Sequence, residues 1–517
     1  MSDQPNVHGS PPIGDAGPKR SLVLSGGGMR VSYQAGVIKA LFEEGLRFFH
    51  GDGTSGGGMS LAMLLSGLSP DQMCERWRSL RVKDFVSFMP LANYLNTAGA
   101  MALGSAEGVV NKVFPHLGID VGRINTARGM RGTFNVCNYT RKVNEVFGHD
   151  QVDVDLLVAG MSLPIFMPPV KRGRFVYTDS AWIRDANPLE AVRQGADEVW
   201  IVWTLGNSPE YRPGLFHQYI QMLEMSANGA LFEDFGHIAE INRRIANGET
   251  MFGRTTPVRV HVIVPEHPLP LDPDLYFGRI DSATLIDMGY RDARRYLSQR
   301  RDEGVPLTPE ATAMSDGPVG ITFRETMTGD FALGESDPKA GAAAGKKAKT
   351  TLAMHAAIEI RDLDGFVAEA THTGGITGHI DFAPLGKGIP AERGVFRLFS
   401  PTDKPNLRLM IYELAFQHDG QPYYLAGQKE VRNDHAGTDL WKDTTTLLTR
   451  LHKGADTTAP VIGAGVLELG IPDLTRLIST VHVTNAAKPT DHAKALATFG
   501  RFFMGSLWDS YGPKRTS

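Results

Sequence analysis

A serine in a small-residue turn is the first feature of the sequence that could do chemistry. Residues 53–57 are Gly53-Thr54-Ser55-Gly56-Gly57, a G-x-S-x-G pattern. Enzymes that use this pattern place the serine at a sharp strand-to-helix turn, where its hydroxyl is exposed and small neighbours avoid a clash. An extended segment precedes the pattern and an apolar helix follows it. The chain has 57 glycines, so the alternative is a plain glycine-rich loop, but Ser55 is a candidate nucleophile.

A second glycine cluster, Gly26-Gly27-Gly28, follows Ser25 and precedes Met29-Arg30. Consecutive glycines at the start of a helix let several backbone N–H groups face one concavity, which suits an oxyanion, a phosphate or a carboxylate. A dinucleotide-binding loop would need G-x-G-x-x-G, and Val31 stands where its last glycine should be. The remaining alternative is a tight turn with no ligand.

The third feature is Asp179, within Tyr177-Thr178-Asp179-Ser180-Ala181 and upstream of Asn187-Pro188. An aspartate at the end of a short extended run can face a serine across a sheet. The alternative is that Asp179 lies in a surface turn, as a single aspartate more often does.

These segments are embedded in alternating strand and helix patterns, which predict an α/β layered fold with a parallel sheet. The expected strands are residues 21–25, 46–50, 154–158, 199–203 and 258–264. Helices are expected from Val31 to Gly45, from Leu61 to about Gly67, over 216–247 with interruptions at Gly229 and Gly236, and over 283–299.

The second half has short alternating strands, which predict a mostly β domain, either a sandwich or a barrel. Strands are expected within 395–399, 409–416, 423–426 and 466–469, with a hairpin turn at 418–421 and a closing helix at 489–507. The expected organisation is a flexible tail at 1–20, an α/β domain at 21–313, and a β domain at 314–517. Residues 336–350, rich in Ala, Gly and Lys, predict a mobile loop.

The composition of the chain narrows the classes of function that the protein could have. The chain has 517 residues, a formal net charge of -4 and two cysteines. No broad basic surface for nucleic acid is expected, and the cysteines have no metal-ligand spacing. No signal peptide and no membrane-spanning segment are expected, so the sequence predicts a soluble cytoplasmic protein for which any membrane contact would be peripheral. The alternative is secretion by a machine that reads no cleavable signal.

Together, Gly26 to Arg30, Gly53 to Gly57 and Asp179 resemble the patatin-like phospholipase family in order and approximate spacing, over roughly residues 20–300. Residues 33–37, the proline-rich stretch 159–169 and residues 187–189 resemble the family's supporting segments. Two positions depart from the family pattern: Ser180 follows the aspartate where glycine is common, and Val31 replaces a glycine. These departures leave a catalytically inactive member open.

The resemblance implies a lipid acyl hydrolase of the phospholipase A or lysophospholipase type, acting at a peripheral membrane surface without metal or cofactor. Ser55 would be the nucleophile and Asp179 its base, forming a catalytic dyad. The oxyanion hole would be formed by Gly26, Gly27 and Gly28, and Arg30 would support the loop or attract a lipid phosphate. The alternatives are an inactive lipid-binding protein and a Ser-His-Asp hydrolase using one of the later histidines: His217, His237, His261 or His267.

The C-terminal half resembles an accessory β-domain of bacterial cholesterol-oxidase-like flavoproteins, on residues 321–329, 410–412, 427–429 and 441–447. That resemblance implies no flavin, because the chain has no dinucleotide fingerprint. A role in lipid or surface contact through Phe396, Phe399, Tyr423, Tyr424 and Trp441 is one interpretation, and a structural appendage is the other.

Overall fold

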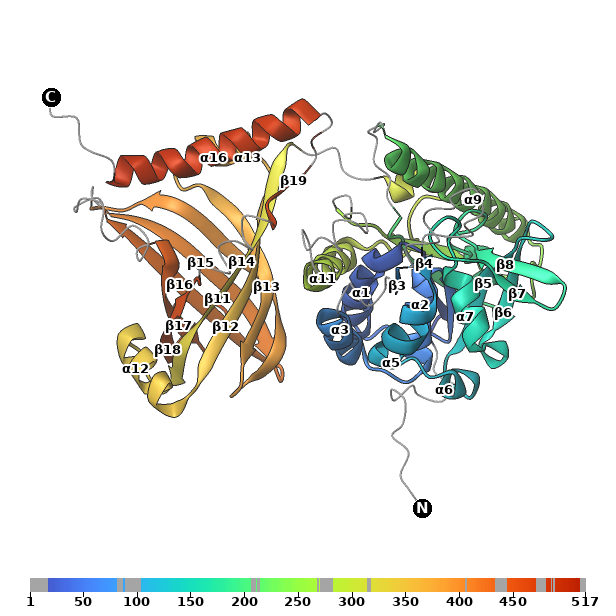
Figure 1. The fold of residues 1–517 in the computed structure, drawn as a ribbon, viewed down its shortest axis with the longest axis horizontal. Helices are drawn as coiled ribbons and strands as arrows, with labels where there is room; N and C mark the ends of the chain where they lie inside the picture. Colours follow the sequence, from blue (N-terminus) through green and yellow to red (C-terminus); the bar gives the residue numbers. More distant parts are fainter. Residues whose placement is uncertain are drawn as a thin grey trace, which may run out of the picture. The chain divides into compact units, whose positions relative to one another are not determined.

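The chain folds as two compact units, Met1–Ser315 and Asp316–Ser517 (Figure 1). The computed structural model describes residues 17–80, 87–88, 104–205, 211, 214–266, 269, 282–313, 318–404, 407–432, 444–470, 480–484, 486 and 489–511. Most of the expected flexible tail and Trp441 therefore lie outside the described residues. Within these ranges, no helix combines the length and the apolar character needed to cross a bilayer.

The first unit is built on a mostly parallel sheet in the order β10-β9-β1-β2-β5-β8-β7, with β6 also paired to β5. Its parallel strands are β1 (Arg20–Leu24), β2 (His50–Thr54), β5 (Arg131–Asn138), β9 (Glu198–Val202) and β10 (Arg259–Ile263). Antiparallel strands β6 (Val143–Gly148), β7 (Val170–Arg172) and β8 (Phe175–Asp179) extend it past β5. A separate short pair joins β3 (Ser87–Phe88) and β4 (Gly104–Ser105).

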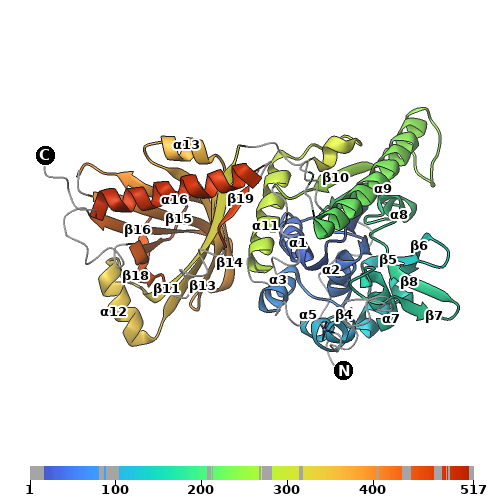
Figure 2. The same cartoon turned by 45° about the horizontal axis from the view of Figure 1, so that its top comes forward.

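Helices cover both faces of this sheet, because the alternation of side chains along a buried strand supplies two cores. On β1, Leu22 and Leu24 belong to one hydrophobic cluster and Val23 to another. The first cluster includes α1 (Ser32–Glu43), α2 (Gly56–Leu65), α3 (Pro70–Ser79), α5 (Phe114–Leu117), α6 (Val121–Asn125), α7 (Val154–Met161) and α11 (Ser282–Gln299). The second includes α8 (Pro188–Arg193) and α9 (Leu215–Ala246), the long green helix in Figure 2.

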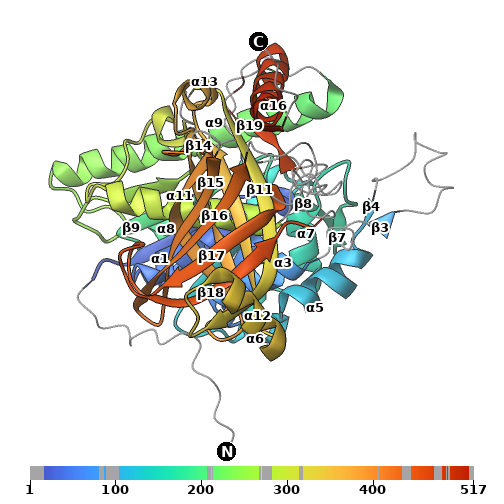
Figure 3. The same cartoon turned by 90° about the vertical axis from the view of Figure 1, so that its left-hand side faces the viewer.

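The second unit is an antiparallel sheet that closes on itself. Its strands are β11 (Gly320–Leu333), β12 (Thr351–Ile360), β13 (Thr373–Phe382), β14 (Gly386–Pro401), β15 (Leu407–His418), β16 (Gln421–Arg432), β17 (Thr446–His452), β18 (Val461–Glu468) and β19 (His482–Thr484). Strand β11 pairs with both β12 and β18, so β11 to β18 form a closed barrel; several of them lie side by side in Figure 3. Helix α13 (Leu363–Ala368) and helix α16 (Pro489–Tyr511) lie over one end (Figure 1). The prediction of an α/β domain followed by a mostly β domain is confirmed, and the sheet pairing selects the barrel.

The second strand was expected at residues 46–50, and this prediction is wrong: β2 is His50–Thr54, inside the glycine-rich stretch. All five residues are buried. Added Cβ atoms would lie 2.5 Å from Leu61 Cδ1 at Gly51 and 2.8 Å from Gly58 Cα at Gly53. Helix α2 packs so closely on this strand that glycine is needed. Because glycine has a low strand propensity, a prediction from propensity places the strand elsewhere.

Two other expectations in the first unit are wrong. Residues 154–158 form the start of helix α7 and no strand, because the Asp153 side chain accepts the Leu156 N–H at 2.8 Å and caps the helix. Helix α9 runs without the interruptions expected at Gly229 and Gly236. An added Cβ at either glycine would meet nothing within 4 Å, so both sit on the open side of the helix.

Residues 336–350 were expected to be a mobile loop, and they instead contain helix α12 (Pro338–Ala348). Asp337 caps the helix by accepting the N–H groups of Lys339 and Ala340. The scarcity of bulky side chains reflects close packing: an added Cβ would lie 2.1 Å from Ala464 O at Gly341 and 2.4 Å from Phe331 N at Gly345.

The hairpin turn expected in the second unit is confirmed. The turn at 418–421 joins β15 and β16 with His418 opposite Gln421, and Asp419 and Gly420 have φ of 50° and 73°. Two aromatics proposed for lipid contact, Phe396 and Phe399, are instead buried in the core of the barrel. A membrane contact through those two rings is therefore excluded.

Candidate active site

Ser55 lies at the turn between β2 and α2. Its φ of 54° and ψ of -129° are strained for a residue with a side chain, which is the backbone expected of a nucleophile at a strand-to-helix turn. The glycines that follow are needed because the turn packs against other backbone. An added Cβ would lie 2.8 Å from Gly28 O at Gly56 and 2.2 Å from Leu24 O at Gly57.

Asp179 contacts Ser55 across the sheet although 124 positions separate them. The Ser55 hydroxyl donates a hydrogen bond of 2.5 Å from Oγ to Asp179 Oδ2. Strand β5 brings the two together, because Asn135 pairs with Thr54 of β2 and the next residue, Val136, pairs with Asp179 of β8. The ends of two strands that are not neighbours in the sheet thus meet.

The Asp179 carboxyl is held away from water and is only 2% exposed. Burial raises its pKa from 3.8 to about 7, while hydrogen bonds from Ser55 and from the backbone of Ala181 and Ser180 lower it. The Ala181 N–H donates to Oδ1 at 2.9 Å and fixes the orientation of the carboxyl group. A carboxylate that titrates near neutral pH and already contacts a hydroxyl can act as a general base.

The glycine loop before α1 packs against Ser55, since an added Cβ at Gly26 would lie 2.9 Å from the Ser55 Cβ. Gly26 was expected to supply an oxyanion-hole amide, and the structure differs. Its N–H donates to both carboxylate oxygens of Asp185, at 3.1 Å each. In the part of the chain that the structure describes, the N–H groups of Gly27 and Gly28 have no hydrogen-bond acceptor. The available donors are therefore Gly27 and Gly28.

Three side chains hold the glycine loop at residues 25–28 in place through hydrogen bonds to its backbone. Arg30 is 5% exposed, and its Nε donates to Gly27 O at 3.1 Å. The Thr204 hydroxyl donates to Gly26 O, and Gln34 Nε2 donates to Ser25 O at 2.7 Å. Of the two expected roles of Arg30, this geometry favours support of the loop over contact with a lipid phosphate.

Asp185 is a buried carboxyl group that the sequence reasoning missed. It has no exposed surface, and burial together with the charge of Asp179 raises its pKa to about 8, while the Gly26 N–H and Arg30 lower it. It couples the glycine loop to the segment that carries Asp179. The available signal was its position two residues before Asn187-Pro188, the start of a segment that resembles the family's.

A buried polar network behind the turn was also missed. Asp52 of β2 accepts hydrogen bonds from Thr133 Oγ1 at 2.6 Å and Asn135 Nδ2 at 2.7 Å. Asn135 Oδ1 accepts from Asn144 Nδ2 and from Asn187 Nδ2, both at 2.8 Å. Burial raises the pKa of Asp52 to about 8. The polar character of the strand before Ser55 is explained by this network, which braces β2 against β5 and α8.

An apolar pocket opens beside Ser55, between α2, β5 and α7. Among the described residues of its lining, Ser55 and Asn135 are the only ones with polar side chains. The other lining residues are Gly53, Gly58, Met59, Ala62, Phe114, Ile119, Phe134, Val136, Leu156, Leu157, Gly160 and Met161. The described lining is therefore predominantly apolar.

Among the described residues, Ser55 makes no hydrogen bond to a histidine. His261 lies on β10, separated from β2 by β9 and β1, where it stacks on Trp200 and contacts the Tyr296 hydroxyl at 2.9 Å. His237 lies on α9, and His267 falls outside the described residues. The geometry thus gives no support to a Ser-His-Asp triad.

Residues 22–193 match the family model described as patatin-like phospholipase. The crystal structure of VipD from Legionella pneumophila aligns with 55% of this chain and 67% of its own, at 14% identity and a TM-score of 0.28, a likeness too low to support an argument. Among curated proteins, none matches the sequence significantly. The segment that holds both Ser55 and Asp179 is therefore similar to patatin-like phospholipases.

Proposed function

We propose that this protein is a serine acyl hydrolase that cleaves lipid esters of the phospholipase A or lysophospholipase type through a Ser55–Asp179 dyad. The observation that carries the proposal is the 2.5 Å hydrogen bond from Ser55 Oγ to a buried carboxylate, made at a strained turn beside an apolar pocket. Strain, burial and an apolar lining are each common in proteins. Their coincidence at one serine is what favours a nucleophile.

The reaction proceeds in two halves. Ser55 Oγ attacks the ester carbonyl carbon while its proton passes to Asp179 Oδ2, and the resulting oxyanion accepts hydrogen bonds from the Gly27 and Gly28 amides. The tetrahedral species collapses, the ester bond breaks, and the leaving alcohol takes the proton from Asp179. Water then attacks the acyl-enzyme with Asp179 again as base, which releases the fatty acid and restores Ser55.

The electrostatics of the site match this scheme. The base must be ionised to accept the serine proton, and burial holds the pKa of Asp179 at about 7. Activity is therefore expected to rise with pH through neutrality. The raised pKa also makes Asp179 a stronger base than an exposed carboxylate, which favours proton transfer from a hydroxyl.

The pocket lining supports an apolar acyl group as the part of the substrate that is recognised. An ester carbonyl at Ser55 would direct one substituent toward Met59, Phe134 and Met161, where a hydrocarbon chain loses contact with water. No charged side chain is found among the lining residues that the structure describes. We therefore assign the pocket to the acyl chain and leave the head group at its mouth.

Covalent labelling tests the nucleophile. A fluorophosphonate probe is expected to modify the protein once, at Ser55, and Ser55→Ala is expected to abolish both labelling and hydrolysis of p-nitrophenyl esters. The matched control is Ser60→Ala, because Ser60 lies on the same helix, is buried, and its Oγ has no hydrogen-bond partner among the described residues. Labelling that persists in Ser55→Ala would refute the assignment, and lipid binding without any labelling would favour an inactive lipid-binding protein.

A further inference from the structure

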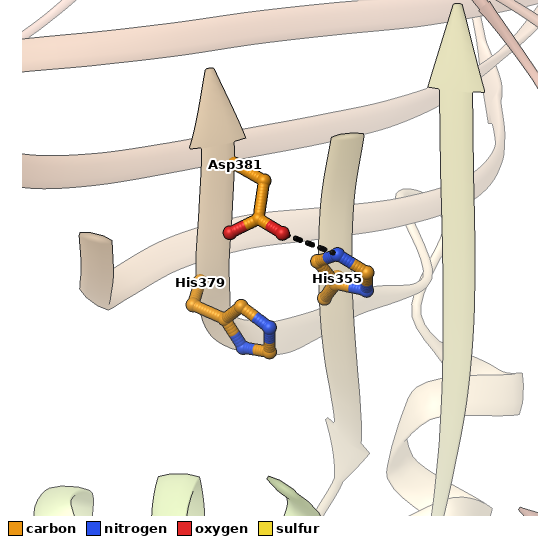
Figure 4. A group of neighbouring side chains, drawn as sticks. All are labelled: His355, His379 and Asp381. Atoms are coloured by element: carbon orange, nitrogen blue, oxygen red, sulfur yellow. Dashed lines mark ion pairs between the residues drawn. The ribbon is translucent and has the colours of Figure 1, made fainter. Parts of the chain in front are cut away.

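Two histidines and an aspartate converge on neighbouring strands of the second unit, far in sequence from the candidate active site (Figure 4). His355 of β12 pairs directly with His379 of β13, and Asp381 follows two residues later on β13. Residues two apart on a strand share one face of a sheet, and a directly opposed pair brings its side chains together. One ligand atom from each of the three lies within 4.8 Å of the other two.

His355 and Asp381 are each oriented by a hydrogen bond on one atom, and this leaves a second atom of each side chain facing the other. His355 Nδ1 hydrogen-bonds Thr326 Oγ1 at 3.2 Å, and Asp381 Oδ1 accepts the Gly388 N–H at 2.6 Å. His355 Nε2 and Asp381 Oδ2 then face each other at 3.6 Å, as the dashed line in Figure 4 marks. Ligands of a metal ion are typically oriented in this way, by hydrogen bonds on the atom that does not bind.

We propose that His355, His379 and Asp381 form a binding site for a divalent transition-metal ion, with zinc as the best fit. Imidazole and carboxylate suit zinc, and two atoms each about 2.1 Å from a tetrahedral ion lie roughly 3.4 Å apart, close to the separation of Nε2 and Oδ2. Three protein ligands leave a fourth position for water.

Binding requires one local movement. The two imidazole rings are stacked, with centroids 4.4 Å apart and planes within 15° of each other. Ring nitrogens bind metal in the plane of the ring, so one ring must rotate about its Cβ–Cγ bond before both can reach the same ion. In the absence of metal, the stack and the ion pair between His355 and Asp381 hold the group together.

The position of the site indicates a structural role. The pairing of β13 with β14 is irregular between Gly375 and Gly378, just before His379, and again between Ile380 and Phe382, where Asp381 lies. An ion held by both β12 and β13 would cross-link the irregular strand to its regular neighbour. The site shares no residue with the proposed dyad, so we expect hydrolysis to be independent of it.

The test uses the full chain after treatment with a chelator. Titration with zinc chloride in a calorimeter is expected to show one equivalent bound, and cobalt is expected to give the visible spectrum of a tetrahedral site. His355→Gln and Asp381→Asn should each weaken zinc binding at least tenfold. The matched control is His418→Gln, because His418 pairs with Asp419 at 3.4 Å in the same way and has nearly the same exposure as His355, 30% against 29%.

Two results would overturn the proposal: no zinc or cobalt binding by the wild-type chain, or binding that is unchanged in both variants. If a variant fails to fold, the cobalt spectrum of the wild-type chain decides, since an octahedral spectrum contradicts the tetrahedral site that is proposed. Ester hydrolysis is measured in parallel. Its loss in Ser55→Ala and its persistence in Asp381→Asn keep the dyad and the metal site separately testable.

Discussion

Replacing Asp179 with asparagine is expected to abolish hydrolysis and, at the same time, to stabilise the first unit above neutral pH. An asparagine fits the site, because its oxygen can accept the Ala181 N–H and its amide can donate to Ser55 Oγ, reversing one hydrogen bond. The amide cannot take up the serine proton. Loss of a general base typically lowers kcat by about 10²- to 10⁴-fold.

The stability gain follows from the pKa of the buried carboxyl. Burial raises that pKa from 3.8 to about 7, so the folded state holds the proton more tightly than the unfolded state does. The contribution of Asp179 to stability is therefore greatest below pH 3.8, falls as the pH rises, and reaches its minimum above pH 7. At 1.36 kcal/mol per pH unit, the interval from 3.8 to about 7 corresponds to a cost of about 4 kcal/mol. Asparagine carries no such cost.

Urea unfolding followed by tryptophan fluorescence measures this effect, because Trp77, Trp200 and Trp203 are buried in the first unit. The gain of Asp179→Asn over the wild type is expected to be about 3 kcal/mol larger at pH 8 than at pH 5. Asp302→Asn, at an exposed turn, is the control and should change neither activity nor stability. A variant that is less stable than the wild type at pH 8 would refute a desolvated carboxylate, and near-normal turnover would point to a different base.

Three further predictions concern the loop, the pH profile and the barrel. Gly26→Ala would place a Cβ 2.3 Å from Asp185 Oδ1 and should lower kcat on the order of 10²-fold, as for a disturbed oxyanion hole. By contrast, the added Cβ of Gly229→Ala would meet nothing within 4 Å, so this variant should raise stability by up to about 1 kcal/mol. Unaltered kcat in Gly26→Ala would contradict the role assigned to the glycine loop. The kcat/KM of the wild type should rise with pH and level off above about 7, as Asp179 ionises; a profile that is flat from pH 5 to 9 would exclude Asp179 as the base. Lys429→Met should cost about 3–5 kcal/mol in unfolding of the second unit, because it leaves Glu325, now bonded to Lys429 at 2.6 Å, buried without its cation. Little change in the second-unit transition would contradict a stabilising role for this pair.

Much of the fold and of the candidate site could be predicted from local sequence. Small residues at Gly26–Gly28 and Gly53–Gly57 mark places where backbone meets backbone, and this steric requirement is visible in the residue types themselves. Helices α1 and α11 and strands β9 and β10 carry apolar patterns that match their element type. The resemblance to the patatin-like phospholipase family then predicted that Ser55 and Asp179 act together, before the structure gave the distance between them.

Local patterns failed where packing overrides propensity. Strand β2 and helix α12 are rich in glycine and poor in bulky side chains, yet each packs tightly on a neighbour, and only the neighbour explains the glycines. Residues 154–158 have a strand-like composition, but the cap at Asp153 starts a helix.

Sequence by itself therefore determined which residue types are available for chemistry and that an α/β domain precedes a β domain. The tertiary structure alone decided which groups meet: the Gly26 amide with Asp185, Asp52 with Asn135, and His355 with Asp381. Each of these contacts joins segments distant in the chain. Their formation depends on strand order and register, which arise from packing of the whole sheet and leave no local mark on the residues involved.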